Sequence, residues 1–358
     1  MEARQNQLIT VRHIKRQVEK RLLHRANVVG VGVGYKNAQG AATGELALIV
    51  SVAQKQPLAA LAAADRVPRS IGGVTTDVVE TGELRALATL LAPTTPRFYT
   101  AHAAPTDRLR PARPGISIGH SQVTAGTLGC LVRRGGDLFI LSNNHVLANS
   151  NLARLGDAIW QPGRADGGLP EDQIANLTDF VPIAFDGDPA PEPPAEGEGC
   201  APLLGALAQL LDQLQLRPSA EAPKNTPGAN HVDCALARPL SPDLVLADIL
   251  GIGVPAGVGH ATLGTQVQKS GRTTGHTRGT IQQIDVTASI NYGGSRMAVF
   301  TDQLLAGPMS AGGDSGALVL DMQLQAVGLL FAGSPATTLI NPIQAVLDAL
   351  HVDIMTSA

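Results

Sequence analysis

Apolar positions repeat with a helical period at the start of the chain and with a strand-like period soon afterwards. Residues 3–24 predict a helix whose apolar face is formed by Leu8, Val11, Ile14, Val18 and Leu22. Apolar, β-rich runs follow at 28–35, 46–52 and 74–79. Together these elements predict a small α/β domain over residues 1–92.

The pattern changes after this domain. Residues 93–115 are rich in proline and lack periodicity, so we interpret them as a linker. From residue 116 onward, short apolar runs alternate with glycine turns, and a last helix is expected with Asn341 as N-cap and Pro342 at its first position. Residues 186–229 interrupt these runs with an acidic, proline-rich insertion. The pattern predicts a mostly β body built as barrels or as a sandwich.

Composition and charge exclude several classes of protein. Apolar residues make up 44% of the chain and charged residues 16%, which excludes a disordered chain or a coiled coil. The net charge of −3 gives no reason to expect nucleic acid or an anionic membrane as a partner. Cys130, Cys200 and Cys234 are odd in number and lack metal-type spacing, and no cofactor or metal is expected. With no apolar signal core at the start, we expect a cytoplasmic protein.

Three short segments carry the residue types needed for nucleophilic catalysis. They are Ser142–Val146 (SNNHV), Val232–Leu236 (VDCAL) and Gly312–Gly316 (GGDSG). In chain order they supply His145, Asp233 and Ser315, which is one of the known orders of a catalytic triad. A serine hydroxyl needs an adjacent base near neutral pH, and His145 is the candidate. The alternatives in the sequence are His276 as the base and Asp157 as the carboxylate.

These motifs resemble those of the trypsin/chymotrypsin family of serine proteases over residues 116–358. Residues 267–281 are similar to a segment of its intracellular members, including the plant narrow-leaf proteases, and SNNHV is similar to the histidine motif of HtrA-like protease domains. The resemblance implies two six-stranded antiparallel β-barrels, over 116–246 and 247–358, with a C-terminal helix. The site would lie in the crevice between the barrels.

The resemblance also implies a role for each site residue. His145 would be the base, Asp233 would orient it, and Ser315 would be the nucleophile, with the N–H groups of Gly313 and Ser315 forming the oxyanion hole. The residues expected to line the substrate cleft are Met309 at the bottom of the primary pocket, Phe331, and Gly333 at an open wall. This set implies a preference for an apolar side chain before the cleaved bond. For Asp314 we expect an internal cationic partner, His120 or Arg272.

The sequence therefore predicts a serine endopeptidase that acts on polypeptides. Two alternatives stay open: a binding or scaffold protein on the same barrels, and a hydrolase of small esters or amides. The basic helix over residues 3–24 is expected to pack on its own domain and not to bind a membrane or nucleic acid. We further expect the domain over 1–92 to mediate homo-oligomerisation or to gate the cleft.

Overall fold

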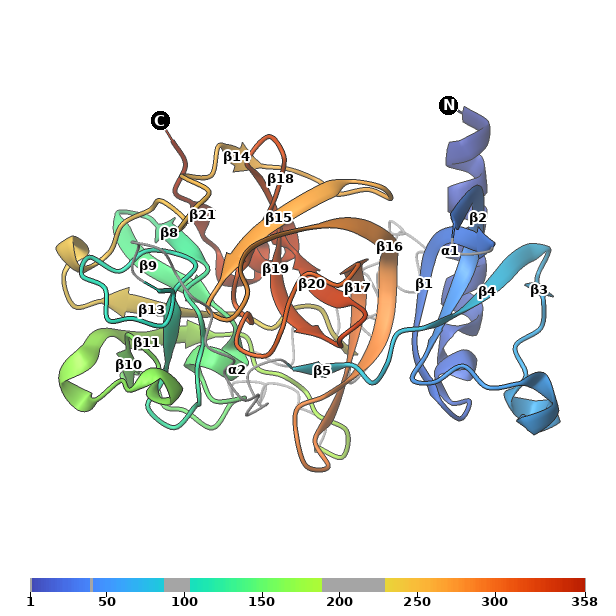
Figure 1. Ribbon diagram of the computed structural model, residues 1–358, viewed down its shortest axis with the longest axis horizontal. Coiled ribbons are helices and arrows are strands. Elements are labelled where there is room, and N and C mark those ends of the chain that lie inside the picture. The colour runs from blue at the N-terminus through green and yellow to red at the C-terminus, as the bar shows by residue number, and fades with distance from the viewer. Residues whose placement is uncertain (1, 39–40, 87–103, 189–228, 358) are drawn as a thin grey trace, which may run out of the picture.

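The computed structural model describes residues 2–38, 41–86, 104–188 and 229–357. Two barrels lie side by side, and a smaller N-terminal unit extends from the second barrel (Figure 1). The predicted insertion at 186–229 falls almost wholly outside these residues, and the predicted linker at 93–115 does so in part. The division of the chain into domains stays a prediction.

The first barrel is a closed ring of antiparallel strands. Around the ring, β6 pairs with β7, and β7 continues directly into β8. Strand β8 pairs with β9, β9 with β13, β13 with β11 and β11 with β10. Strand β10 pairs with β6 and so returns to the start of the ring. The N–H groups of Leu128 and Gly129, between β7 and β8, donate to Ile116 and Leu141 and complete the closure. The strands are β6 (Ser117–His120), β7 (Gly126–Thr127), β8 (Cys130–Arg134), β9 (Asp137–Ser142), β10 (Ala158–Trp160), β11 (Gln173–Phe180) and β13 (Ala235–Pro239).

The second barrel is also closed. Its ring runs β15, β16, β17, β20, β19, β18 and back to β15, and every pairing is antiparallel. The strands are β15 (Gln266–Gly271), β16 (Gly275–Asn291), β17 (Met297–Ala306), β18 (Leu318–Asp321), β19 (Gln325–Gly333) and β20 (Thr338–Pro342). With β7 and β8 counted as one continuous strand, each ring has six strands, so the predicted fold class is confirmed.

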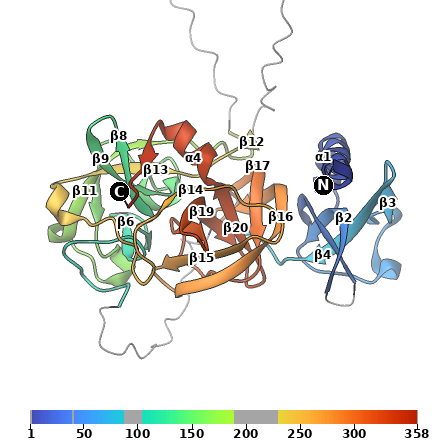
Figure 2. The ribbon, with the colours of Figure 1, turned by 90° about the horizontal axis from the view of Figure 1, so that it is seen from above.

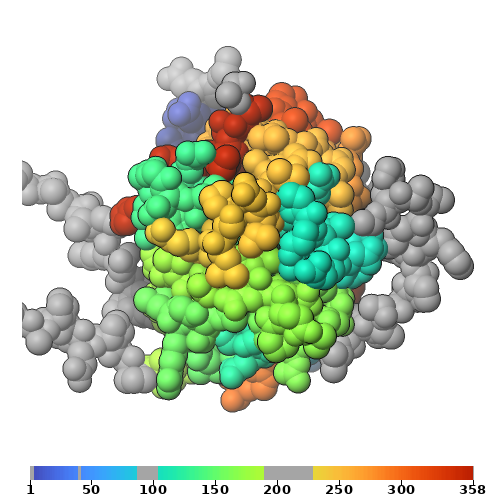
Figure 3. Space-filling model, turned by 90° about the vertical axis from the view of Figure 1, so that its left-hand side faces the viewer, coloured from blue at the N-terminus to red at the C-terminus, as the bar shows by residue number. Residues whose placement is uncertain are grey.

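Helix α4 (Ile343–Leu350) lies where the two barrels meet (Figure 2). Its buried side chains pack with residues of both barrels, including Leu141 of β9 and Leu329 of β19. The helix begins one position later than predicted, with Pro342 at the N-cap. Asn341 does not cap it, because its side chain bonds Asp233 and Gln303 instead. Strand β21 (Asp353–Ile354) then pairs with β8 on the first barrel, whose outer face is shown in Figure 3.

The N-terminal unit shares its sheet with the second barrel. Helix α1 (Glu2–Leu23) packs on β1 (Val28–Ala38) and β2 (Ala41–Val52), and β4 (Val74–Glu80) and β3 (Ser70–Ile71) extend the sheet. Strand β1 pairs antiparallel with β16, with Gly30 opposite Ala288. A Cβ at Gly32 would lie 2.6 Å from the Gln283 amide oxygen, so glycine permits this close approach. One continuous sheet therefore joins the unit to the second barrel.

Buried polar groups strengthen this junction. The Lys15 side chain, 4% exposed, pairs with Glu19 and donates to the Thr287 hydroxyl of β16 at 2.8 Å. The Thr287 hydroxyl in turn donates to Glu19 at 2.6 Å. The basic helix predicted from sequence thus packs by one face on its own sheet and on the second barrel. Among the described residues, no helix combines the length and apolar character needed to cross a membrane.

Candidate active site

A buried histidine–aspartate pair lies at the edge of the first barrel. His145 is in α2 (Asn144–Leu147), directly after β9, and Asp233 precedes β13, which pairs with β9. Neighbouring strand ends therefore bring the two residues together. The His145 Nδ1 atom lies 2.5 Å from Asp233 Oδ2, and the His145 N–H donates to Asp233 Oδ1 at 3.2 Å. The side chains of His145 and Asp233 are 2% and 0% exposed, so solvent screens the interaction between them little.

A tyrosine from the second barrel completes the surroundings of the pair. Tyr292, in the turn after β16, donates its hydroxyl to Asp233 Oδ2 at 2.8 Å. Its ring meets the His145 ring edge to face, with centroids 5.8 Å apart. Burial of the Tyr292 hydroxyl and, as the second cause, the charge of Asp233 raise the pKa of Tyr292 well above its usual value. The hydroxyl therefore keeps its proton and remains a donor. The main chain of Asp233 is held as well, because its N–H donates to the side-chain oxygen of Asn341 at 3.1 Å.

The second ring nitrogen of His145 is unused. Within the part of the chain that the structure describes, the buried Nε2 atom has no hydrogen-bond partner. A buried polar atom without a partner costs free energy, and a catalytic role is one explanation for such an atom. Nε2 is the atom that would accept a proton from a nucleophile.

Ser315 lies across Gly126 from Val146, the residue after His145, and its hydroxyl bonds elsewhere. Its hydroxyl donates to the Phe331 carbonyl at 3.1 Å, and its own carbonyl accepts the Thr127 N–H at 2.7 Å. A Cβ added to Gly126 would meet both Val146 and the Ser315 carbonyl, which places Ser315 across Gly126 from the residue after His145. The structure thus brings the three predicted residues into one region, and the hydroxyl points to Phe331 instead of His145 Nε2.

The turn before Ser315 is held by a buried ion pair. Gly313 has φ of +97°, which favours glycine, and a Cβ there would meet Thr273 and Arg272. Asp314 and Lys269 of β15 are each 0% exposed, with Nζ and Oδ2 3.1 Å apart. The remaining bonds to the Asp314 carboxylate come from the N–H groups of Ala311, Thr273 and Thr274 and from the Thr274 hydroxyl.

The expected partners of Asp314 are therefore wrong. Arg272 pairs with Asp166, and His120 lies 3.0 Å from Asp157. Lys269 takes the position because β15 pairs with β18, the strand that follows Ser315, with Lys269 opposite Val319. The cation that holds the turn thus comes from within the second barrel.

The residues expected to line the substrate cleft occupy two places. Phe331 and Gly333 lie on β19, and the carbonyl of Phe331 faces Ser315. The Met309 side chain is 3% exposed and belongs to the core of the second barrel, where a Cβ on Gly279 would lie 2.6 Å from its sulfur. Its place at the bottom of a substrate pocket stays a prediction.

The alternative base and carboxylate have other partners. His276 Nε2 bonds the Gln268 side chain at 2.9 Å, and burial lowers the pKa of His276. Asp157 bonds His120, as noted above. Burial and the Asp233 charge raise the pKa of Cys234, so this thiol stays protonated. The described residues contain no cluster of three histidine, cysteine or acidic side chains arranged to hold a metal ion.

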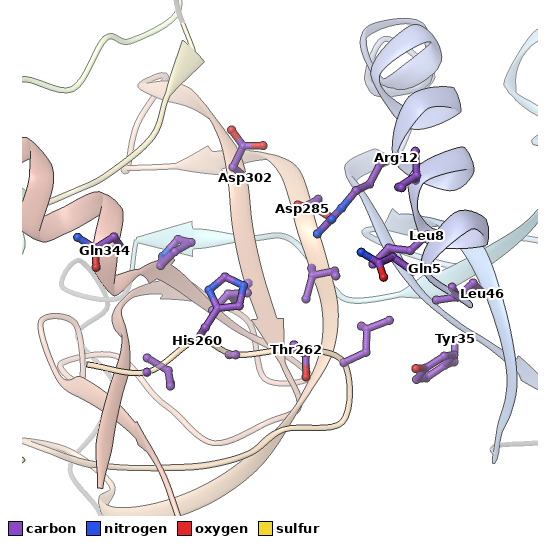
Figure 4. A pocket seen from close by; sticks show the side chains of 18 of the residues that line it. Gln5, Leu8, Arg12, Tyr35, Leu46, His260, Thr262, Asp285, Asp302 and Gln344 are labelled. Atoms are coloured by element: carbon purple, nitrogen blue, oxygen red, sulfur yellow. The ribbon is translucent and has the colours of Figure 1, made fainter. Parts of the chain in front are cut away.

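A separate cavity of about 680 Å³ lies between α1 and the second barrel (Figure 4). Arg12 and Asp285 line it and form an ion pair, and His260 and Tyr35 lie on its walls. None of the candidate catalytic residues lines this cavity. It is therefore distinct from the candidate active site.

Sequence reasoning missed two residues of the site. Tyr292 stands in a glycine-rich turn, and Lys269 is a single cation inside a strand-like run, VQKSG. A lone charge within such a run is an available signal for a buried ion pair. No local pattern identifies Tyr292, because its partner is 59 positions away in the chain.

The sequence matches no family model and no curated protein. Among solved structures the chain is similar to Thermobifida fusca Protease A, with 18% identity and a TM-score of 0.44 over 69% of this chain and 100% of that one. It is similar to Nocardiopsis protease at 15% identity and a TM-score of 0.42, over 68% and 100% of the two chains. A glutamic acid specific serine protease is similar at 16% identity and a TM-score of 0.43, with the same coverage.

Proposed function

We propose that this protein is a serine endopeptidase that cleaves polypeptides through an acyl-enzyme formed on Ser315. The observation that carries the proposal is the buried His145 ring, bonded to Asp233 through Nδ1 and unpartnered at Nε2. Asp233 fixes the tautomer in which Nδ1 carries the proton, so Nε2 is left as the base. Scaffold proteins have no need of such an arrangement.

The chemistry follows from these positions. The Ser315 hydroxyl turns from the Phe331 carbonyl to His145 Nε2, which takes the proton as the oxygen attacks the substrate carbonyl carbon. The N–H groups of Gly313 and Ser315 stabilise the oxyanion. The protonated His145 then gives its proton to the leaving amine, and the acyl-enzyme remains. Water, deprotonated by His145, attacks the ester and releases the acid with Ser315 restored.

Other features support the finer parts of the proposal. The Lys269–Asp314 pair holds the turn that carries Gly313 and Ser315 without a cleaved N-terminus, so we expect this turn to form without proteolytic processing. An apolar residue before the cleaved bond is preferred, since Met309 supplies no charge to select arginine or lysine.

Labelling with a fluorophosphonate tests the proposal directly. We expect the wild-type protein to be labelled on Ser315, with Ser315→Ala as the control that is not labelled. A casein digest then separates a peptidase from a small-ester hydrolase, and a peptide library measures the preference before the cleaved bond. The enzyme is rejected if neither the folded wild-type protein nor the folded Leu84→Ala variant is labelled, and rapid cleavage after arginine rejects the apolar preference.

A further inference from the structure

One edge of β19 is shared by three successive neighbours. Strand β18 pairs with its first part, where Leu318 is opposite Leu329. The Gly316 N–H then donates to the Leu330 carbonyl, and the Ser315 hydroxyl donates to Phe331. Beyond Ser315, the two-residue strand β5 (Arg85–Ala86) pairs with Ala332 and Gly333. Strand β5 comes from the end of the N-terminal unit and crosses to the barrels (Figure 1).

The chain direction of β5 carries it toward Ser315. The pairing is antiparallel, with Arg85 opposite Gly333 and Ala86 opposite Ala332. Residue numbers in β5 therefore rise toward Phe331, whose carbonyl accepts the Ser315 hydroxyl. A peptide that extended this ladder by one residue would bring its main chain opposite Phe331, beside the nucleophile.

Side chains and main chain hold β5 firmly in this place. Leu84 and Ala86 are each 1% exposed and pack with Phe331 and Tyr292, whereas Arg85 faces solvent and pairs with Glu83. This alternation is that of a strand with one buried face. The Leu84 carbonyl also accepts the Asn291 N–H at 2.9 Å.

The segment leading into β5 is fastened as well. The Ser334 hydroxyl, just after β19, donates to the Thr81 carbonyl, and Asn291 donates its side-chain amide to Glu83 at 2.8 Å. Residues 81–86 are thus bonded on one side to the end of β16 and on the other to the end of β19. The candidate nucleophile and base are buried, at 0% and 4% exposure.

We infer that residues 84–86 are an intramolecular, substrate-like strand that occupies the peptide-binding edge of β19 and thereby restrains cleavage. The inference rests on the proposed function, since it assigns the edge at Phe331–Gly333 to the main chain of a peptide substrate. Such an edge binds an added strand through its free N–H and C=O groups, and it pairs with only one strand at a time. A substrate must therefore displace β5.

A kinetic test uses the buried anchor of β5. Leu84→Ala removes apolar contacts that hold the strand, so kcat/KM for an apolar tetrapeptide anilide is expected to rise at least ~10-fold. Arg85→Ala is the matched control, because that side chain lies on the solvent face of the same strand, and its kcat/KM should stay within about 2-fold of wild type. Thermal unfolding of each variant establishes that it is folded.

A second measurement needs no variant. Hydrogen exchange of residues 81–86 is followed in the wild-type protein before and after it binds a peptide boronic acid that ends in leucine. We expect these amides to exchange at least ~10-fold faster in the bound protein, because the inhibitor takes the β19 edge and releases β5.

The outcomes separate the inference from the proposed function. If neither the wild-type protein nor Leu84→Ala is labelled by a fluorophosphonate, the protease proposal fails and the inference falls with it. If wild type is active, the inference is overturned by an unchanged kcat/KM in folded Leu84→Ala. It is equally overturned if residues 81–86 remain protected once the boronic acid is bound.

Discussion

The first barrel contains two histidine–aspartate pairs that differ in what surrounds them. In the His120–Asp157 pair both ring nitrogens are used, since Nε2 meets Asp157 and Nδ1 accepts the Gln122 N–H. Asp157 is 38% exposed there. In the His145–Asp233 pair the carboxylate is fully buried and Nε2 has no partner among the described residues.

The difference lies in what the second barrel adds. Tyr292 and Asn341, both from the second barrel, bond Asp233, whereas the His120–Asp157 pair is made by the first barrel alone. A pair with every atom satisfied is a structural link. A buried pair with one basic atom left open is suited to move a proton.

Removal of each carboxylate gives the largest contrast between the pairs. Asp233→Asn is expected to lower kcat by about 10³–10⁴, because an amide does not select the tautomer with a free Nε2. Asp157→Asn is the control and should leave kcat within about 2-fold of wild type. Steady-state hydrolysis of a peptide anilide measures both, and equal losses in the two variants would remove the distinction.

Loss of the buried cation in the second barrel should have the next largest effect. Lys269→Met leaves the buried Asp314 carboxylate without its ion-pair partner, which is expected to cost about 3–5 kcal/mol of unfolding free energy. Urea unfolding measures the change. Lys36→Met is the control, because Lys36 forms an exposed pair with Glu45 at 3.8 Å. If both variants unfold at the same urea concentration, the turn before Ser315 does not depend on Lys269.

Tyr292→Phe tests the contribution of the second barrel to the His145–Asp233 pair. It removes one donor to a buried carboxylate while keeping the ring, so a loss of about 10-fold in kcat is expected with KM little changed. Tyr35→Phe, on the wall of the separate cavity beside α1, is the control. A Tyr292→Phe variant with wild-type kcat would show that the hydroxyl does not contribute to catalysis.

The smallest effect concerns the exposed pair and its pH dependence. Two interactions lower the pKa of Asp157 in the folded protein. The hydrogen bond from the Arg154 N–H has the larger effect, and the bond to His120 has the next largest. The contribution of Asp157 to stability is therefore present above the unfolded value of about 4 and is lost as pH falls through the lowered pKa. Because solvent screens this group, Asp157→Asn should cost less than about 1 kcal/mol at pH 7 and almost nothing at pH 2. Thermal unfolding at the two pH values measures this, and a larger loss at pH 2 would contradict it.

Much of the fold was predictable because its signals are local. Glycine turns and short apolar runs mark the strands of both barrels, and the helical stripe from Leu8 to Leu22 marks α1. The short helix motif SNNHV and the turn GGDSG can be recognised where they stand. The docking of β5 on β19 could not be predicted, because it depends on main-chain groups that every residue carries.

The candidate site likewise has features that local sequence signals identify and features that only the tertiary structure decides. His145, Asp233 and Ser315 were identifiable from their residue types and their order along the chain, since the chemistry of an imidazole, a carboxylate and a hydroxyl belongs to the side chains themselves. The tertiary structure alone decided which nitrogen of His145 has no partner, which cation pairs with Asp314 and which strand pairs with β19 at Gly333. The physical reason is that burial and hydrogen bonding depend on residues brought together from distant parts of the chain, and barrel closure supplies those neighbours.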